Sequence, residues 1–117
     1  MDEPIVVVDA NEEQCRELCT MLEDWHYRAT PMHSLRGLET YIQATACRAV
    51  ILDLDTVPVD NRVIRKLKRI DQSLCIMVLS SRPFHPELEE AMSSHIYACL
   101  NKPVDEEELG YWIKSLF

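Results

Sequence analysis

Short apolar runs separated by amphipathic segments dominate the hydrophobic pattern of this chain. Residues 4–9, 49–52 and 74–79 are almost wholly apolar and have the length of a strand. Runs that are apolar on both faces are typical of strands buried between two helical layers in a parallel sheet. We expect two further, shorter strands at residues 27–32 and 96–100.

Between these strands, apolar residues recur every three or four positions, as on one face of an amphipathic helix. The first helix is expected over about 12–25, with Asn11 as its N-cap and acidic residues in its first turn. Ser34 is expected to cap the second helix, and a third is expected over about 60–70, after a turn around Pro58. The expected inward-facing residues are Cys15, Leu18, Leu22 and Trp25 in the first helix, Leu35, Leu38 and Ile42 in the second, and Val63, Leu67 and Ile70 in the third.

Two later segments carry signals for the start of a helix. His85-Pro86-Glu87 predicts an N-cap followed by proline at the first helical position. Asp105 with Glu108 has the spacing of a capping box and opens a last helix, whose expected inward residues are Leu109, Ile113 and Leu116. Strands and helices that alternate in this way predict one α/β domain over residues 1–117, with five parallel strands, five helices and right-handed crossovers.

Four of the predicted strands end in residues with useful chemistry. Asp9 follows the first strand, Asp53 the central one, Ser80 the fourth and Lys102 the fifth. In parallel sheets, functional groups gather beyond the carboxyl ends of the strands, where neighbouring termini lie ~5 Å apart. Each residue alone also fits a structural role, as a cap, a turn residue or an exposed charge. Together they favour one shared site.

The motifs at these strand ends resemble those of the receiver domains of bacterial two-component response regulators, and the likeness covers the whole chain. It is carried by Val-Val-Val-Asp9, Leu-Asp53-Leu-Asp55, Val-Leu-Ser80-Ser81 and Leu-Asn-Lys102-Pro103. The resemblance implies a flavodoxin-like, doubly wound sheet with the strand order 2-1-3-4-5. It also implies a cis peptide bond before Pro103, which proline tolerates far better than any other residue.

The same resemblance implies that Asp53 is a phosphoacceptor, which takes a phosphoryl group from a histidine kinase or phosphotransfer protein. Mg²⁺ would be held by Asp9, Asp53 and the backbone carbonyl of Asp55, whose side chain is expected to point toward solvent. Lys102 and the Ser80 hydroxyl would bind phosphoryl oxygens, and movement of Ser80 would switch a partner-binding surface. Catalysis by such a domain is limited to its own phosphorylation and dephosphorylation.

Three positions depart from the receiver pattern. Ala10 stands where a second acidic residue is usual, which predicts weak Mg²⁺ binding. Thr56 and Val57 stand in place of the usual Met-Pro. Cys99 occupies the position of the switch aromatic, three residues before the lysine, and Tyr97 shares its strand face without being equivalent. We therefore expect weakened coupling between the switch hydroxyl and the surface.

These departures leave alternatives open. The chain also fits a pseudo-receiver, which uses the same fold for binding or dimerisation without phosphorylation. Asp53-Leu54-Asp55-Thr56-Val57 further matches the nucleophile motif of haloacid-dehalogenase-like phosphatases, although that motif normally lies on the first strand of its fold. A flavodoxin is disfavoured, because Asp9 and the glutamates after it would face the flavin phosphate.

The last helix suggests an interface. Tyr111 and Trp112 lie beside its inward residues, so we expect one of the two rings to be partly exposed. Receivers commonly pair through their last two helices and last strand. The resemblance therefore implies a weak homodimer that phosphorylation strengthens.

Composition adds limits on location and partners. The 117 residues include 12 basic and 20 acidic ones, a formal net charge of −8, which disfavours direct nucleic-acid binding by this domain. No segment approaches the ~20 apolar residues of a membrane span, and the start of the chain lacks the basic region of a signal peptide, so a cytoplasmic location is expected. The five cysteines are expected to be small buried side chains, although the spacing of Cys15 and Cys19 would also suit two metal ligands.

Overall fold

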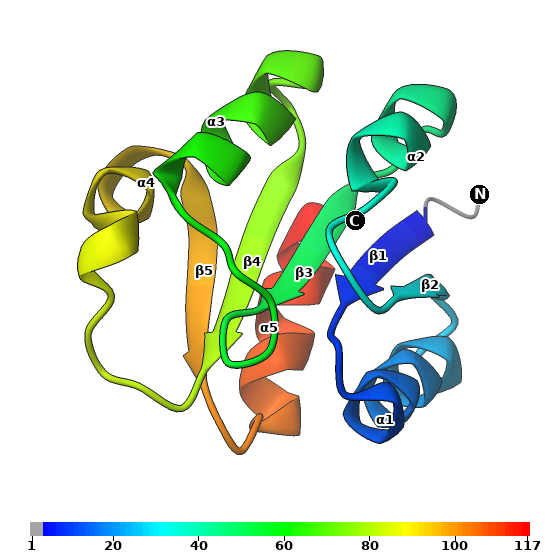
Figure 1. The fold of residues 1–117 in the computed structure, drawn as a ribbon. Helices are drawn as coiled ribbons and strands as arrows, with labels where there is room; N and C mark the ends of the chain where they lie inside the picture. The colour runs from blue at the N-terminus through cyan, green and yellow to red at the C-terminus, as the bar shows by residue number, and fades with distance from the viewer. Residues whose placement is uncertain (1–3) are drawn as a thin grey trace.

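The computed structural model describes residues 4–117, so the first three residues, which enter the signal-peptide argument, lie outside it. The described residues form one parallel sheet with the strand order β2-β1-β3-β4-β5 and helices on both faces (Figure 1). The strands are β1 (Pro4–Val8), β2 (Arg28–Met32), β3 (Ala49–Asp53), β4 (Cys75–Ser80) and β5 (Ile96–Asn101). The helices are α1 (Glu12–Asp24), α2 (Leu38–Ala44), α3 (Asn61–Ile70), α4 (Glu89–Ser94) and α5 (Glu106–Leu116), with a 3₁₀ turn, η1 (Pro86–Leu88), before α4. The flavodoxin-like fold predicted from the sequence is confirmed.

Two apolar cores lie on opposite faces of the sheet, because successive residues of a strand point to opposite sides. Val50 and Leu52 of β3 belong to the core under α2, α3 and α4. Ala49 and Ile51 belong to the core under α1 and α5. All five residues of β3 are buried, as is expected of the central strand in a sheet covered on both faces.

Side chains cap the starts of three helices. Asn11, Asp60 and Asp105 each accept a 3.0 Å hydrogen bond from a backbone N–H two or three residues further along the chain. Such caps satisfy N–H groups that have no partner within the helix. Asn11 and Asp105 are the caps predicted from the sequence, and both are confirmed.

The predicted cap of the second helix is wrong. Ser34 Oγ accepts a hydrogen bond from the backbone N–H of Arg36 and closes a local turn instead. The helix α2 begins at Leu38, directly after Gly37. The φ of Gly37 is 82°, in the left-handed region that glycine adopts most easily. The predicted inward residues Leu38 and Ile42 are buried, as expected.

The inward face of α3 also differs in detail from the expectation. Ile64 and Leu67 are its fully buried residues, whereas Val63 and Ile70 are only partly buried. Both patterns have helical spacing, so the sequence left the rotation of the helix uncertain by about one position. His85 stands before η1, but its side chain makes no capping hydrogen bond.

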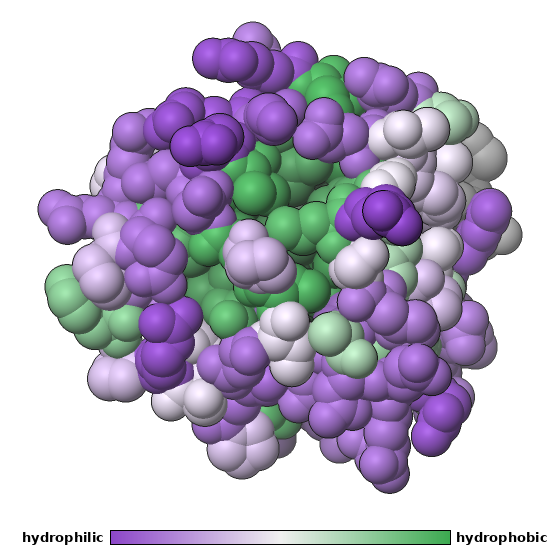
Figure 2. All heavy atoms as spheres, viewed as in Figure 1, coloured by the Kyte–Doolittle hydropathy of each residue, from purple (hydrophilic) through white to green (hydrophobic). Residues whose placement is uncertain are grey.

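Most of the face drawn in Figure 2 is hydrophilic, with apolar residues visible in the hollow among the surrounding helices. Leu35, Leu38, Val63 and Leu67 line part of this hollow between α2 and α3, and Arg62 and Lys66 flank it. Within residues 4–117, no helix has both the length and the hydrophobicity needed to cross a membrane.

Candidate functional site

The acidic residues Asp9 and Asp53 lie side by side at the carboxyl edge of the sheet. Asp9 follows β1 and Asp53 ends β3, and these strands pair in register, with Val8 opposite Leu52. Each aspartate is only 1% exposed. Two carboxylates removed from water in this way need hydrogen bonds or positive charge around them, because isolated buried charges are costly.

Lys102 supplies the positive charge. It follows β5, and its Nζ lies 2.5 Å from Oδ1 of Asp53 and 3.0 Å from Oδ2 of Asp55. Burial alone would lower the pKa of Lys102, but its hydrogen bonds to the two carboxylates outweigh this, and the pKa is raised. The ammonium group therefore stays charged throughout the neutral range. It joins β5 to the end of β3.

Asp55 takes a different orientation from the one expected. Its side chain was expected to point toward solvent, but it turns into the site, where both carboxylate oxygens accept from the backbone N–H of Ser81 (3.3 and 3.1 Å). Burial tends to raise the pKa of Asp55, but the hydrogen bonds from Lys102 and Ser81 lower it by more. Asp55 thus connects the loop after β3 to the loop after β4.

Thr56 is a site residue that the sequence analysis treated only as a departure from the receiver pattern. Its Oγ1 lies 3.0 Å from Oδ1 of Asp9 and 2.8 Å from Oδ2 of Asp53, and it accepts a 3.0 Å hydrogen bond from the backbone N–H of Ala10. Asp9 and Thr56 are 47 residues apart in the sequence, and no local motif indicates that they meet. The fold alone brings them together.

The other hydrogen bonds to the carboxylate of Asp9 come from the start of α1. The side-chain amide of Gln14 donates to Oδ2 of Asp9, and the backbone N–H of Asn11 donates to Oδ1 at 2.9 Å. His33 Nδ1 lies 3.1 Å from the backbone carbonyl of Asp9. Both oxygens of Asp9 are therefore occupied by neutral donors of the protein.

Ser80 is buried near this edge of the sheet, but its hydroxyl faces its own loop. It accepts a 2.9 Å hydrogen bond from the backbone N–H of Arg82 and lies 3.3 Å from the carbonyl oxygen of the same residue. The sequence correctly predicts that Ser80 ends a strand beside Lys102, whose N–H donates to the Ser80 carbonyl at 3.0 Å. The peptide bond between Lys102 and Pro103 is cis, as predicted.

The donor set suits Mg²⁺ in its chemistry, since this ion prefers carboxylate and carbonyl oxygens. Asp9 and Asp53 would provide carboxylate oxygens, and the backbone carbonyl of Asp55 lies on the adjoining loop. Over residues 4–117, however, no three acidic, histidine or cysteine side chains converge as a ready-made metal site. The oxygens that a cation would use are engaged by Thr56, Gln14 and Lys102.

The thiols do not form a second site. Cys15 and Cys19 are buried on α1, and Cys15 Sγ donates to the carbonyl of Val7 at 3.6 Å. Burial raises the pKa of Cys15 and raises that of Cys19 to about 12, which opposes the thiolate form that a metal needs. The expectation of buried structural thiols is confirmed for these two residues and for Cys47, whereas Cys99 is exposed.

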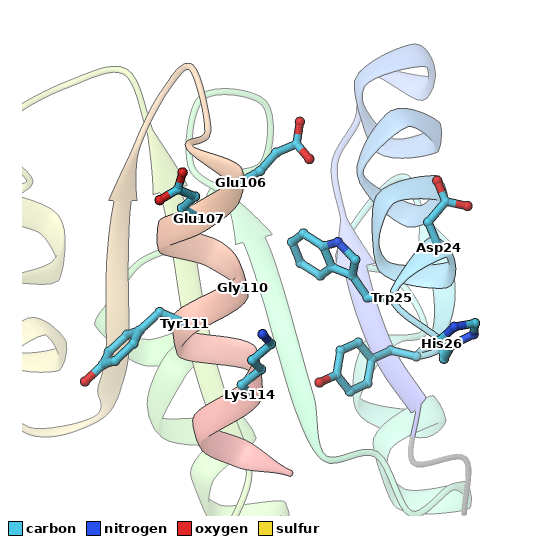
Figure 3. A pocket seen from close by; sticks show the side chains of 9 residues that line it. Asp24, Trp25, His26, Glu106, Glu107, Gly110, Tyr111 and Lys114 are labelled. Carbon is cyan, nitrogen blue, oxygen red and sulfur yellow. The ribbon is translucent and has the colours of Figure 1, made fainter.

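A groove of about 640 Å³ lies between the end of α1 and α5, and neither Asp9 nor Asp53 lines it. Figure 3 shows Trp25 projecting from the end of α1 toward Gly110 on α5, with the side chains of Glu106 and Lys114 on either side of this contact. A smaller hollow of about 240 Å³ adjoins the acidic site. Its lining includes Gln14 and Lys102.

Comparisons with known proteins agree with this geometry. The family model described as "Response regulator receiver domain" matches residues 5–114. The chain is similar in structure to the signal receiver domain of an HD domain-containing protein from Pseudomonas fluorescens Pf-5, with 19% identity, a TM-score of 0.86 and coverage of 99% of this chain and 94% of that one. A CheY-like receiver domain from Methanospirillum hungatei JF-1 has 14% identity, a TM-score of 0.86 and coverage of 98% and 93%.

A third similar structure is that of the beryllofluoride-activated NtrC4 receiver domain dimer, with 23% identity, a TM-score of 0.85 and coverage of 97% of this chain and 95% of that one. At these identities, the similar structures support the fold alone. No curated protein sequence matches the chain significantly.

Proposed function

Because this chain belongs to the family of response regulator receiver domains, which are signalling domains, we propose that it accepts a phosphoryl group on Asp53. The donor would be a phosphohistidine on a histidine kinase or phosphotransfer protein. The observation that carries this proposal is the placement of Asp53. It is a buried carboxylate at the end of the central strand, in contact with the only residue of the site that carries a positive charge, Lys102.

The proposed reaction moves one phosphoryl group. A carboxylate oxygen of Asp53 attacks phosphorus, an O–P bond forms, the P–N bond to the imidazole breaks, and the imidazole leaves with the bonding electron pair. One oxygen of Asp53 contacts Lys102 and the other contacts Thr56, so one of these contacts must be released. Lys102 would then pair with a phosphoryl oxygen, and Mg²⁺, when bound, would neutralise part of the charge on the transferring group.

A partner could approach through the hollow beside the site. Its lining combines the polar residues Gln14, Glu17 and Lys102 with apolar side chains from α1, β4 and the segment after β5. The apolar residues are Leu18, Met21, Leu79, Pro103 and Val104. A surface that is apolar at its centre and polar toward the reacting group suits a protein partner.

The response to phosphorylation would pass through the loop after β4. Ser80 would exchange its hydrogen bonds with Arg82 for one to the phosphoryl group, and Ser81 is already bound to Asp55. Cys99 offers no ring that could swing with Ser80. We therefore propose that the signal reaches the surface through the backbone of residues 80–82.

The surface that receives this signal would include β5 and α5. Tyr97 on β5 and Tyr111 on α5 are 36% and 63% exposed, and both rings stack edge-on against Trp112. Exposed aromatic side chains grouped in this way favour a protein interface. We propose that two copies of the chain pair through α4, β5 and α5.

The test is phosphorylation of Asp53. Incubation with a small phosphodonor and Mg²⁺ should yield a phosphorylated species by intact-protein mass spectrometry. Reduction of the acyl phosphate followed by peptide mapping should place the modification on Asp53. We expect Asp53→Asn to abolish the product and Asp55→Asn to retain it. A product that persists in Asp53→Asn and disappears in Asp55→Asn would overturn the assignment.

A second candidate function, that of a pseudo-receiver, is favoured by one observation. Thr56 joins Asp9 to Asp53 where a cation is expected, so the pocket is satisfied without metal or phosphate. In that case neither a phosphodonor nor a kinase would modify the protein, and partner binding would be the same for Asp53→Asn and wild type. The family match over residues 5–114 favours a receiver over the phosphatase alternative.

A further inference from the structure

The hydroxyl of Thr56 occupies the space between the two buried carboxylates of the acidic site. It accepts from the backbone N–H of Ala10, and its Oγ1 lies 3.0 Å from Oδ1 of Asp9 and 2.8 Å from Oδ2 of Asp53, so its one proton can be donated to either carboxylate. A hydrogen bond to a charged group is among the stronger ones in proteins. The hydroxyl therefore lies between the two carboxylates, where it can donate to either of them.

Two of the departures from the receiver pattern are in direct contact in the structure: Ala10 and Thr56. Ala10 has no side chain beyond Cβ, and its N–H donates directly to Thr56 Oγ1 at 3.0 Å. An acidic side chain at position 10 would bring a third carboxylate to this point. Without one, the room and the backbone donor are left to the threonine.

Gln14 completes the arrangement from the other side of Asp9. Its amide donates to Oδ2, while Thr56 and the backbone N–H of Asn11 contact Oδ1. Asp9 is 1% exposed, so few water molecules can take over if these partners are lost. A cation that binds Asp9 must displace at least one of them.

We propose that Thr56 and Gln14 act as a latch that sets the divalent-cation affinity of the acidic site by holding its carboxylates in the cation-free state. This proposal rests on the Mg²⁺ site of the proposed function. Mg²⁺ gives up its own water reluctantly and requires near-octahedral oxygen ligands, so it competes poorly against donors already in place. The latch makes cation binding, and hence phosphorylation, respond to changes around Thr56.

The test is the isosteric change Thr56→Val, which removes the hydroxyl and keeps the shape of the side chain. The cation-free protein should become less stable, because Asp9 and Asp53 lose a shared donor. Mg²⁺ should then bind at least about tenfold more tightly by calorimetry, the equivalent of one lost hydrogen bond to a charged group. The rise in melting temperature on adding Mg²⁺ should also be larger than in wild type.

Three further variants separate the latch from general effects. Thr56→Ser keeps the hydroxyl and should bind Mg²⁺ like wild type. Gln14→Met removes the other neutral donor at similar length and should tighten Mg²⁺ binding in the same direction. Thr30→Val is the matched control, because Thr30 Oγ1 lies 3.0 Å from the hydroxyl of Tyr41, away from the acidic site, and its loss should leave Mg²⁺ affinity unchanged.

The proposal is overturned if Thr56→Val binds Mg²⁺ no more tightly than wild type, or if neither protein binds it. Weaker binding in Thr56→Val would mean that the hydroxyl supports the cation. Failure of the latch is separable from failure of the proposed function. Tighter Mg²⁺ binding with no phosphorylation of either protein would uphold the latch and reject the phosphoacceptor role. If wild type and Thr56→Val are both phosphorylated and bind Mg²⁺ equally tightly, the phosphoacceptor role is upheld and the latch is rejected.

Discussion

At the scale of single residues, the acidic site depends on the ion pairs and hydrogen bonds among five side chains. Lys102 contacts both Asp53 and Asp55, and Thr56 contacts both Asp9 and Asp53. Three carboxylates with one ammonium group leave an excess of negative charge, and two of the carboxylates, those of Asp9 and Asp53, are only 1% exposed. Such an arrangement is stable only while each oxygen keeps a donor, which makes the site sensitive to substitution and to pH.

Substitution of Asp55 tests the sensitivity of the site to pH. Its pKa lies below the ordinary value of 3.8, so its charged form stabilises the folded state at neutral pH. A lowered folded pKa means that this contribution is present above about pH 4 and is lost as the pH falls through the folded value. We expect Asp55→Asn to reduce stability at pH 7 by about 1 kcal/mol, and the difference from wild type to shrink below pH 4. Melting temperatures between pH 2 and pH 7 measure this.

Asp60→Asn is the matched control for that experiment, since it removes one acidic charge and keeps an oxygen that can cap α3. It should lower the melting temperature at pH 7 less than Asp55→Asn does, because asparagine can keep the cap. A gap between wild type and Asp55→Asn that widens as the pH falls from 4 to 2 would contradict the assigned direction of the pKa shift.

The sequence predicts where the residues of the site lie, but only part of what they contact. Asp9 and Asp53 lie together because they follow the neighbouring strands β1 and β3. Lys102 reaches Asp53 from the same edge of the sheet after β5, as alternating strands and helices predict. The orientation of Asp55 and the bridge made by Thr56 depend on the local path of the loop after β3. That path has no periodicity from which it could be read.

At the scale of the elements, apolar periodicity and caps predict most helices within one or two residues. One exception is the predicted cap His85, whose side chain makes no capping hydrogen bond. Another is the segment before α2, where Ser34 has the chemistry of a cap but Gly37 takes the left-handed conformation that begins the helix. Both residue types occur at helix starts, and the choice between them depends on how α2 packs on the sheet. Tertiary contacts decide such a boundary.

The helix α5 offers a test at this scale, because it carries a glycine in its interior. A Cβ built at Gly110 would lie 3.7 Å from Cη2 of Trp25, which is ordinary van der Waals contact (Figure 3). Glycine is less favourable than alanine inside a helix. We therefore expect Gly110→Ala to raise the free energy of unfolding by about 0.5–1 kcal/mol in urea denaturation. Gly110→Leu should instead lower it, since its further carbons would meet the indole.

If Gly110→Ala proves destabilising, the indole of Trp25 lies closer to α5 than the distance of 3.7 Å indicates. A companion variant, Ser115→Ala, changes another α5 position to alanine away from the indole. Its hydroxyl bonds only to the carbonyl of Tyr111, one turn earlier in the helix. Ser115→Ala should therefore raise the free energy of unfolding by little more than the difference in helix propensity between serine and alanine.

At the scale of the whole molecule, charge is distributed unevenly between the two helical layers. The ten residues of α3 include five basic and no acidic side chains, whereas the first turns of α1 and α5 are acidic. Two of the basic residues have partners within the protein: Arg65 pairs with Glu90 at 2.9 Å, and Lys68 donates to the carbonyls of Gln72 and Leu74. Such contacts are typical of a solvated helix face.

The aromatic surface on β5 and α5 gives the prediction at this scale. Tyr97, Tyr111 and Trp112 form one cluster, and part of each tyrosine is left exposed by residues 4–117. We expect a weak homodimer by sedimentation velocity, strengthened by Mg²⁺ with beryllofluoride, because a phosphate mimic at Asp53 would act on the loop that leads to α4. Tyr111→Ala should weaken it at least tenfold, as expected for an aromatic residue central to an interface.

Phe117→Ala is the control for this change, because that exposed ring packs on Tyr27, with ring centroids 5.0 Å apart, and does not belong to the β5 cluster. It should leave dimerisation unchanged. If Phe117→Ala weakens the dimer and Tyr111→Ala does not, the chains pair through the end of α5 near β2 rather than through β5. A protein that stays monomeric at high concentration, with and without the phosphate mimic, would mean that the aromatic cluster serves a different partner.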